Sequence, residues 1–253
     1  MTMPAAESVA AGGLPDGPPE RARIGVIAPY DLALDDELLR WVPAGVSLHL
    51  TRTPLLAEPV GVEQAERLTD HDQIRRCVAD LKAIEPAGYA YACTSASFVH
   101  GLAGERALTT LMERTGGAPA VTTSGALLAA LAALDVRSVA VAAPYDVETT
   151  DRLVCFLAEA RISVVGKGFL DLRERIWEVS YRVTGKLVRT LPRAGAEAIV
   201  LSCTNLSSYD LIGPLEAELG MPVISANQAT VWAALRLIGR RAVGAGQTLI
   251  ERT

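Results

Sequence analysis

The stretch IGVIAPYD at residues 24–31 recurs as VAVAAPYD at residues 139–146. In both copies a short apolar run leads directly into the tetrad Ala-Pro-Tyr-Asp. A short, continuous apolar run that ends at a turn signal is typical of a strand buried on both faces of a parallel sheet. The repeat therefore predicts two equivalent strands, one near the start of each half of an internally duplicated chain.

Two further pairs of segments recur in the same order along the 253-residue chain. YACT at residues 91–94 is matched by LSCT at 201–204, and PAVTTS at 119–124 is matched by PVISAN at 222–227. Short motifs match by chance, so similar composition of strand-to-helix loops is the alternative explanation. Three matches in one order favour duplication.

Strand and helix patterns alternate between these segments. Short apolar runs predict strands at residues 24–28, 46–50, 88–92, 119–122, 138–142, 162–165, 197–202 and 222–225. Helical spacing predicts helices at about residues 34–41, 63–84, 104–115, 125–134, 147–160, 171–191, 208–219 and 227–241. Alternating strands and helices imply right-handed crossovers and parallel sheets. The predicted fold class is therefore α/β, with two pseudo-symmetric halves, each a four-stranded parallel sheet with helices on both faces, and the active site between them.

The expected domain organisation follows from the repeat. Residues 1–21 are rich in Ala, Gly and Pro and are predicted to form a disordered tail. Residues 22–135 are predicted to form the first βα half, and residues 136–253 the second.

Composition narrows the classes of partner and compartment. The net charge of −5 argues against a nucleic-acid partner, because nucleic-acid sites are basic. The sequence has no apolar run of the roughly 20 residues that a membrane span needs, and no signal-peptide pattern at its start. Four cysteines without a CxxC pair do not resemble a disulfide framework or a zinc ribbon. We therefore expect a cytoplasmic protein without a membrane partner.

Two of the four cysteines, Cys93 and Cys203, stand in the repeated segments directly after predicted strands. Ligands of open parallel sheets bind beyond the carboxyl ends of the strands. Two facing halves would therefore place one thiol on each side of a shared cleft. Two such thiols can move protons on opposite faces of a small molecule, or one can attack carbon while the other supplies a proton. Hydroxyl and amide donors that could hold a carboxylate follow the cysteines at Thr94, Ser95, Ser97, Thr204, Asn205, Ser207 and Ser208.

The two pairs of cysteines differ in context. A free thiol has a pKa of about 8.5 and needs help to ionise at neutral pH. Cys93 and Cys203 lie in short loops leading toward predicted helices, where N–H groups and the helix dipole favour the thiolate. Cys77 and Cys155 lie inside predicted helices and are interpreted as buried small hydrophobes.

At the cysteine segments the chain resembles the aspartate/glutamate racemase superfamily, in particular its maleate cis–trans isomerase and arylmalonate decarboxylase branch. The resemblance covers residues 22–240. Its most specific segments are YACTS at 91–95, LSCTNL at 201–206, PLE at 214–216 and LGMPV at 219–223. The decarboxylases carry only the second cysteine, with glycine at the first position, so the presence of both favours an isomerase or racemase.

The resemblance implies roles for the two cysteines and their neighbours. In a maleate isomerase Cys93 would add to the double bond and Cys203 would trade a proton. In a racemase the same pair would remove and return an α-proton. Positions that match substrate-binding or carboxylate-binding residues of the family are Thr94, Tyr145, Thr204 and Asn205. The family also implies a homo-oligomer, a small carboxylate substrate, and neither a cofactor nor a metal ion.

The sequence departs from the maleate isomerases at one predicted substrate-binding position, Asp31, where those enzymes carry an asparagine. A carboxylate there would repel a dicarboxylate unless it were protonated or paired with a cation. Arg173 and Arg175 lie near the expected place of a second family asparagine. They could hold an acid group or lie on a solvated helix face. These departures argue against maleate itself as the substrate.

Three functions stay open from the sequence. The first is a two-thiol isomerase or racemase of a small carboxylic acid. The second is a decarboxylase or lyase of the same fold that uses mainly Cys203. The third is a metabolite-binding protein without catalysis, because fold alone does not fix function.

Overall fold

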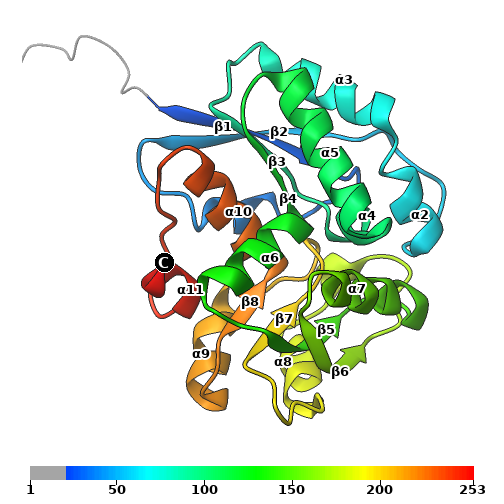
Figure 1. The fold of residues 1–253 in the computed structure, drawn as a ribbon, viewed down its shortest axis with the longest axis vertical. Coiled ribbons are helices and arrows are strands. Elements are labelled where there is room, and N and C mark those ends of the chain that lie inside the picture. Colours follow the sequence, from blue (N-terminus) through cyan, green and yellow to red (C-terminus); the bar gives the residue numbers. More distant parts are fainter. Residues whose placement is uncertain (1–20) are drawn as a thin grey trace, which may run out of the picture.

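The eight predicted strands form two separate four-stranded parallel sheets in the computed structural model, which describes residues 21–253. Residues 1–20 of the predicted tail lie outside the described residues. The first sheet has the order β2-β1-β3-β4 and contains β1 (Ala22–Ala28), β2 (Val46–Arg52), β3 (Gly88–Tyr91) and β4 (Ala120–Thr122). The second sheet has the order β6-β5-β7-β8 and contains β5 (Ser138–Ala143), β6 (Ser163–Phe169), β7 (Ala198–Leu201) and β8 (Val223–Ser225). The predicted α/β fold of two similar halves is confirmed (Figure 1).

Burial along the strands explains why their sequences read as continuous apolar runs. Every residue of β3 and β7 is buried, because each strand has neighbours on both sides and helices above and below. The edge strands β2 and β6 are only partly buried along most of their length. The apolar pattern that predicts a strand is therefore strongest in the inner strands β3 and β7.

The helices connect the strands and cover both sheets. They are α1 (Asp35–Leu39), α2 (Val62–Arg67), α3 (His71–Lys82), α4 (Thr94–Phe98), α5 (Gly101–Gly116), α6 (Thr123–Ala133), α7 (Val147–Glu159), the 3-10 turn η1 (Ile176–Glu178), α8 (Tyr181–Thr190), α9 (Tyr209–Leu219), α10 (Ala226–Leu237) and α11 (Thr248–Arg252). The predicted helix at 63–84 is divided by Asp70, whose side chain accepts hydrogen bonds from the backbone N–H groups of Asp72 and Gln73. The short helix α4, directly after Cys93, was not predicted.

The prediction of one helix over residues 171–191 is wrong in its first half. The backbone N–H groups of Leu170, Asp171 and Leu172 donate to the carbonyls of residues 143–145 instead of to a helix ladder. These hydrogen bonds hold the segment against the loop that follows β5. The regular helix α8 begins only after Ser180, whose side chain caps it.

Two long apolar helices, α6 and α10, join the halves (Figure 1). Each follows the last strand of its own half, and the two pack on one another between the sheets. Helix α10 also contacts β3 and β4 of the opposite sheet, and the buried hydroxyls of Thr123 and Thr230 lie 2.8 Å apart between the helices. The division of the chain at residue 135 stays a prediction, since these helices give both sheets a common core.

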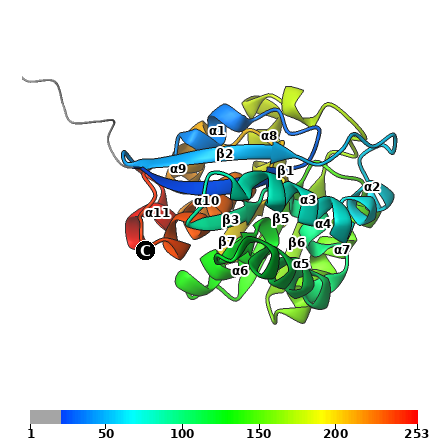
Figure 2. The same ribbon diagram turned by 90° about the horizontal axis from the view of Figure 1, so that it is seen from above.

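The C-terminal segment closes the molecule on the side away from the carboxyl ends of β1 and β2. In Figure 2, α11 lies near the end of the molecule where these strands begin. The Trp232 indole N–H donates to the Thr253 hydroxyl over 2.7 Å, which ties this segment to α10. Among residues 21–253 no helix is both long and apolar enough to cross a bilayer.

We expect Leu127→Ala to lower the free energy of unfolding by about 2–5 kcal/mol. Leu127 lies on α6, is fully buried and belongs to a core cluster drawn from both halves. Urea denaturation followed by circular dichroism measures the change. The matched control is Leu55→Ala, since Leu55 is 81% exposed and its truncation should change stability by less than about 0.5 kcal/mol. Equal effects of the two substitutions would contradict a shared α6–α10 core.

Candidate active site

The loops after β3 and β7 bring Cys93 and Cys203 to one small cavity between the halves. Cys93 is 4% exposed and Cys203 is 9% exposed. The other residues that line the cavity are Pro29, Asp31, Val60, Gln64, Leu68, Thr94, Ser95, Tyr145, Ile176, Thr204 and Asn205. Both predicted catalytic cysteines and all six predicted substrate-binding residues therefore line this single cavity, whereas the candidate donors Ser97, Ser207 and Ser208 do not.

Cys93 adopts an extended backbone and is the residue from which α4 begins. Its thiol faces donors of its own loop: the Ser95 hydroxyl lies 3.9 Å from Sγ, and the Ala96 backbone N–H also contacts the thiol. The Ser97 hydroxyl bonds the carbonyl oxygen of Cys93 over 2.7 Å. The loop is thus held by its own short side chains.

Cys203 adopts a left-handed backbone with a φ of +93°, which is unusual for a residue other than glycine. The turn brings the backbone N–H of Asn205 to 3.4 Å from the Cys203 Sγ. Residues with such a backbone are kept only where the surrounding structure holds them, and they cluster at functional sites.

Burial dominates the ionisation of both thiols. Desolvation raises the pKa of Cys93 to about 11, although the Ala96 N–H and the Ser95 hydroxyl partly offset it. Desolvation likewise raises the pKa of Cys203 to about 12, partly offset by the Asn205 N–H and the Tyr145 hydroxyl. The predicted backbone N–H donors do lower the pKa of each thiol, but burial outweighs them and the net shift is upward. Helix α4 has only five residues, and no helix directly follows Cys203.

The predicted carboxylate-binding residues differ in how their side chains are used. The Thr94 hydroxyl is buried and has no hydrogen-bond partner within residues 21–253. The Thr204 hydroxyl instead donates to the carbonyl of Ala92 over 3.1 Å. The Thr94 hydroxyl is therefore the one left available to a ligand.

Asn205 lines the cavity, but its side-chain amide is occupied. The amide NH₂ donates to the backbone carbonyl of Asp31, and its oxygen accepts from the Ala33 N–H, both over 2.9 Å. The Asn205 side chain thus has a positioning role in this structure, and its carboxylate-binding role stays a prediction. It holds the Asp31 loop of the first half against the Cys203 loop of the second.

The two copies of the Ala-Pro-Tyr-Asp tetrad place different side chains in the cavity. In the second copy Tyr145 lines the cavity, and Asp146 caps α7 by accepting from the Thr149 N–H. In the first copy Asp31 lines the cavity, and the Tyr30 hydroxyl accepts from the Gln64 amide instead. Burial raises the pKa of Asp31, partly offset by its own backbone and by Gln64.

Neither arginine near the expected second asparagine lines the cavity. The Arg173 guanidinium lies 2.7 Å from the Asp146 carboxylate, and Arg175 pairs with Glu178 on the surface. Among residues 21–253, no three His, Cys, Asp or Glu side chains are grouped so that they could hold a metal ion.

The other two cysteines lie outside the cavity. Cys77 is buried in α3, as predicted. Cys155 on α7 is exposed, so its interpretation as a buried hydrophobe is wrong. It lies on a face of its helix that no other element covers enough to bury it.

Two loops that were not predicted from the sequence to be part of the site also line the cavity. Val60 precedes α2, and Ile176 begins η1; both line the cavity and are less than 10% exposed. The loops are joined by the Val60 N–H, which donates to the Arg173 carbonyl over 2.8 Å. The cavity is only partly enclosed, and its free space of about 20 Å³ holds about one water molecule. A larger ligand therefore requires the surrounding side chains or loops to move.

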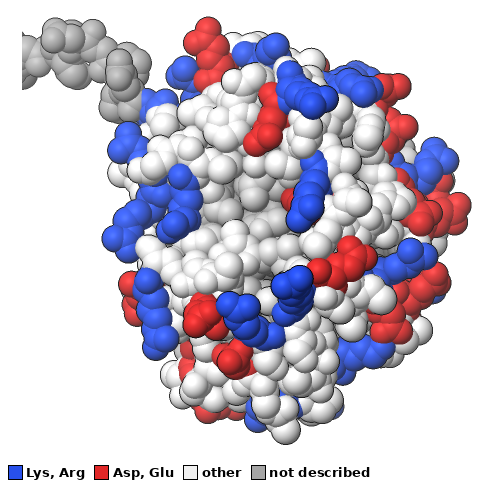
Figure 3. Space-filling model, in the orientation of Figure 1, with Lys and Arg blue, Asp and Glu red and all other residues white. Residues whose placement is uncertain are grey.

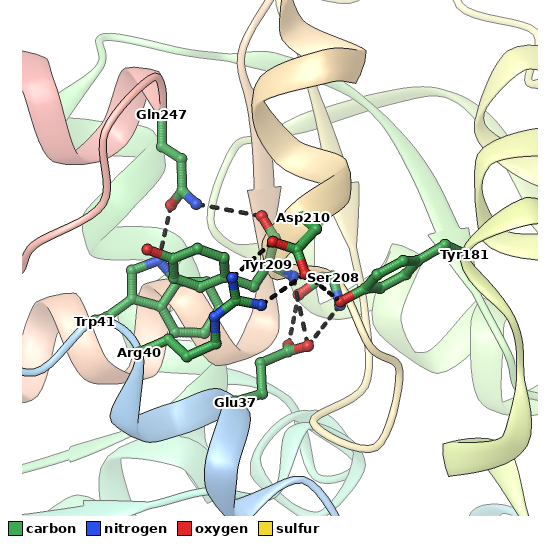
Figure 4. A network of polar contacts seen from close by, with 8 residues as sticks. All are labelled: Glu37, Arg40, Trp41, Tyr181, Ser208, Tyr209, Asp210 and Gln247. Carbon is green, nitrogen blue, oxygen red and sulfur yellow. Dashed lines mark hydrogen bonds and ion pairs between the residues drawn. The ribbon is translucent and has the colours of Figure 1, made fainter.

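A buried carboxylate from the first half holds the segment that follows Cys203 (Figure 4). Glu37 on α1 is 4% exposed and accepts from the backbone N–H and the hydroxyl of Ser208, each over 2.9 Å. The Asn227 amide donates to the same carboxylate over 2.9 Å. No signal within either half predicts this pairing, because its partners are more than 170 residues apart.

Polar and aromatic contacts surround the Glu37 carboxylate (Figure 4). The Arg40 guanidinium makes two hydrogen bonds to Asp210 and lies 3.7 Å from the centre of the Tyr209 ring. The Tyr181 hydroxyl donates to Asp210 over 3.1 Å.

On the face shown in Figure 3, acidic and basic side chains are interspersed, so neither sign of charge dominates.

The chain matches the arylmalonate decarboxylase family over residues 57–250. It is 41% identical to the arylmalonate decarboxylase of Bordetella bronchiseptica over 152 residues, which are 58% of this chain and 62%, less than two thirds, of that relative. It is 30% identical to the maleate isomerase of Nocardia farcinica over 231 residues, which are 85% of this chain and 89% of that relative.

Structural similarity extends over the whole fold. One similar solved structure is a mutant maleate cis–trans isomerase of Nocardia farcinica with a covalently bound succinylcysteine intermediate. Its TM-score is 0.83 at 25% identity, covering 91% of this chain and 98% of that one.

Two similar parallel-sheet halves, with a cysteine from each at their junction, define an enzyme class of the aspartate/glutamate racemase type. Within that class, the chain belongs to the arylmalonate decarboxylase family, in the branch that also contains the maleate isomerases. The family resemblance predicted from the cysteine segments is confirmed.

We expect alkylation of Cys93 and Cys203 by iodoacetamide to accelerate about tenfold per pH unit from about pH 7 to about pH 10. Only the thiolate reacts, and its fraction rises with pH because both raised pKa values lie above this window. Peptide mass spectrometry measures each site separately, with the exposed Cys155 as the internal control. A plateau below about pH 9 would show that the thiols ionise more easily than their burial implies.

We expect Glu37→Gln to lower the free energy of unfolding by about 2–4 kcal/mol, because a charged acceptor of buried hydrogen bonds is lost. The new amide NH₂ would also face N–H donors. Urea denaturation measures the change. The matched control is Glu218→Gln, which removes an exposed pair with Arg189 and should cost less than about 1 kcal/mol. Equal costs would contradict the role of Glu37 in joining the halves.

Proposed function

We propose that the protein is a cofactor-independent isomerase of a small carboxylic acid, with Cys93 and Cys203 as its two catalytic residues. The observation that carries the proposal is the presence of both thiols at one small cavity, each from a different half. A substrate held between them would meet a sulfur on each side. Belonging to an enzyme family that includes maleate isomerases supports the proposal.

The proposed reaction begins in the minor fraction of enzyme in which Cys93 is the thiolate and Cys203 the thiol, because burial raises the pKa of Cys93 to about 11 and that of Cys203 to about 12. The Cys93 sulfur adds to one alkene carbon, and the π electrons move toward the neighbouring carboxylate as an enediolate. Cys203 then donates its proton to the other carbon, which leaves a saturated thioether. The succinylcysteine intermediate of the similar Nocardia isomerase structure is a thioether of this kind.

The carbon–carbon bond of the thioether is single, so it can rotate. The Cys203 thiolate takes back the proton, the carbon–sulfur bond breaks with its electron pair returning to Cys93, and the trans alkene leaves. Both cysteines recover their starting protonation states, so the cycle balances without an external acid, base or oxidant. In a racemase-like reaction the same pair would exchange an α-proton from opposite faces.

The residues around the thiols suit a carboxylate. The unpartnered Thr94 hydroxyl and the Ser95 side chain are available beside Cys93. Thr204 and Asn205 line the cavity beside Cys203 as part of its loop. Tyr145 lines the cavity close to Cys203. These donors would stabilise the enediolate as charge develops on it.

We further propose that the enzyme is cytoplasmic and acts as a homo-oligomer.

A decarboxylase is the second candidate, favoured by the 41% identity to an arylmalonate decarboxylase. In that reaction the bond to the departing carboxylate breaks, carbon dioxide leaves, and the electron pair remains as an enediolate. Cys203 would protonate the α-carbon and recover its proton from water. Cys93 would then have no bond to make.

The two candidates are separated by single cysteine substitutions. For an isomerase, we expect Cys93→Ala and Cys203→Ala each to lower turnover of a cis-alkene acid by at least about 1,000-fold. Proton nuclear magnetic resonance distinguishes the vinyl protons of the cis substrate from those of the trans product. Cys155→Ala, on the exposed face of α7, is the matched control and should keep full activity.

Retention of arylmalonate decarboxylation in Cys93→Ala, with loss in Cys203→Ala, would favour the second candidate. Unchanged turnover in both variants would exclude the paired-thiol mechanism. Ligand protection of the thiols without turnover of any acid would indicate a binding protein.

A further inference from the structure

We infer that Asp31 selects a substrate that presents an uncharged hydrogen-bond donor, such as a carboxamide N–H, where a dicarboxylate would place its second carboxylate. The inference rests on the proposed function, because it assigns the second end of the substrate held between Cys93 and Cys203. Its substrate class is the monoamide of a small dicarboxylic acid.

The cavity holds one carboxylate and no cation. Among its thirteen lining residues Asp31 is the only acid, and none is Lys, Arg or His. The Asp31 side chain makes no ion pair within residues 21–253. Burial raises the pKa of this carboxyl. At a pH where it is ionised, a ligand group placed against Asp31 meets negative charge that no lining cation cancels.

The second copy of the tetrad is an internal comparison. Asp146, the counterpart of Asp31, is 5% exposed, caps α7 through the Thr149 N–H, and lies 2.7 Å from the Arg173 guanidinium. Its charge is used within the structure. Asp31 has no cationic partner of this kind; the Gln64 amide, which also bonds Tyr30, is the neighbouring side-chain donor.

The Asp31 loop is held in place by main-chain contacts, and the Asp31 carboxyl itself accepts from the Gln64 amide and from its own backbone. Asn205 bonds the backbone carbonyl of Asp31 and the N–H of Ala33. These bonds fix the main chain at and after Asp31, and the Tyr30 N–H, which donates to the Thr53 hydroxyl over 3.1 Å, fixes it before Asp31. Asp31 is therefore a built feature of the cavity rather than a surface acid that swings away.

Charge decides which ligand end fits here. A carboxylate beside Asp31 would add a second negative charge to a small, partly enclosed space, where like charges repel more strongly than in water. A carboxamide has the same shape, is neutral, and donates N–H groups to a carboxylate. The other end of the ligand keeps its carboxylate, for which the unpartnered Thr94 hydroxyl is a donor.

Protection of the thiols tests the selection without requiring turnover. Succinamate and succinate are saturated analogues that differ only in the amide, and each is titrated against iodoacetamide labelling of Cys93 and Cys203 at mildly alkaline pH. In the unmodified protein we expect succinamate to protect at about tenfold lower concentration than succinate. Labelling of the exposed Cys155 should not change with either ligand.

Asp31→Asn removes the charge and keeps the shape, so it should abolish or reverse the preference for succinamate. The matched control is Asp36→Asn, an exposed acid on α1 outside the cavity, which should keep it. Equal or better protection by succinate in the unmodified protein would overturn the inference, whatever the variant does. Failure of both ligands to protect would also overturn it.

Turnover of maleamate and maleate separates this inference from the proposed function. Faster isomerisation of maleate than of maleamate would overturn the inference and leave the isomerase intact. The expected protection pattern without turnover of either compound would overturn the isomerase and uphold the selection by Asp31.

Discussion

A carboxylate contributed by one half and buried against the cysteine loop of the other fixes the geometry on which this site depends. Glu37 accepts from Ser208, while Thr204 bonds Ala92 and Asn205 bonds the Asp31 loop. These three contacts of the segment that begins at Cys203 all cross between the halves. Because buried polar groups are costly unless paired, this segment is stable only when the first half is in place. The unusual backbone of Cys203 is held by that requirement.

The two halves have equivalent strands and different loops. The same tetrad supplies an acid to the cavity from one copy and a tyrosine from the other. The two cysteine loops differ as well, since one begins a short helix and the other is an irregular turn. A symmetric scaffold thus encloses an asymmetric cavity, as a substrate with two different ends requires.

The eight strands and the meeting of Cys93 with Cys203 were predictable from sequence. Buried parallel strands leave continuous apolar runs, and the carboxyl ends of such strands are where ligands bind. The place of Val60 and Ile176 in the cavity lining was not predictable, because both lie in irregular segments whose hydrogen-bond partners are distant in sequence. The role of Asn205 was missed for a related reason. An amide that binds a ligand and one that clamps a loop look identical in a linear chain, as do a free aspartate and one paired like Asp146.

The crossing of α10 onto the first sheet also constrains how the chain can be made. During synthesis β3 and β4 are complete long before α10, which lies within the last thirty or so residues of the chain and covers part of their apolar surface. Until α10 is synthesised, the apolar surface of β3 and β4 that it covers stays exposed to water. We therefore expect a fragment that ends after β4 to aggregate. The two halves are similar in topology, but each relies on a helix of the other to cover part of its core.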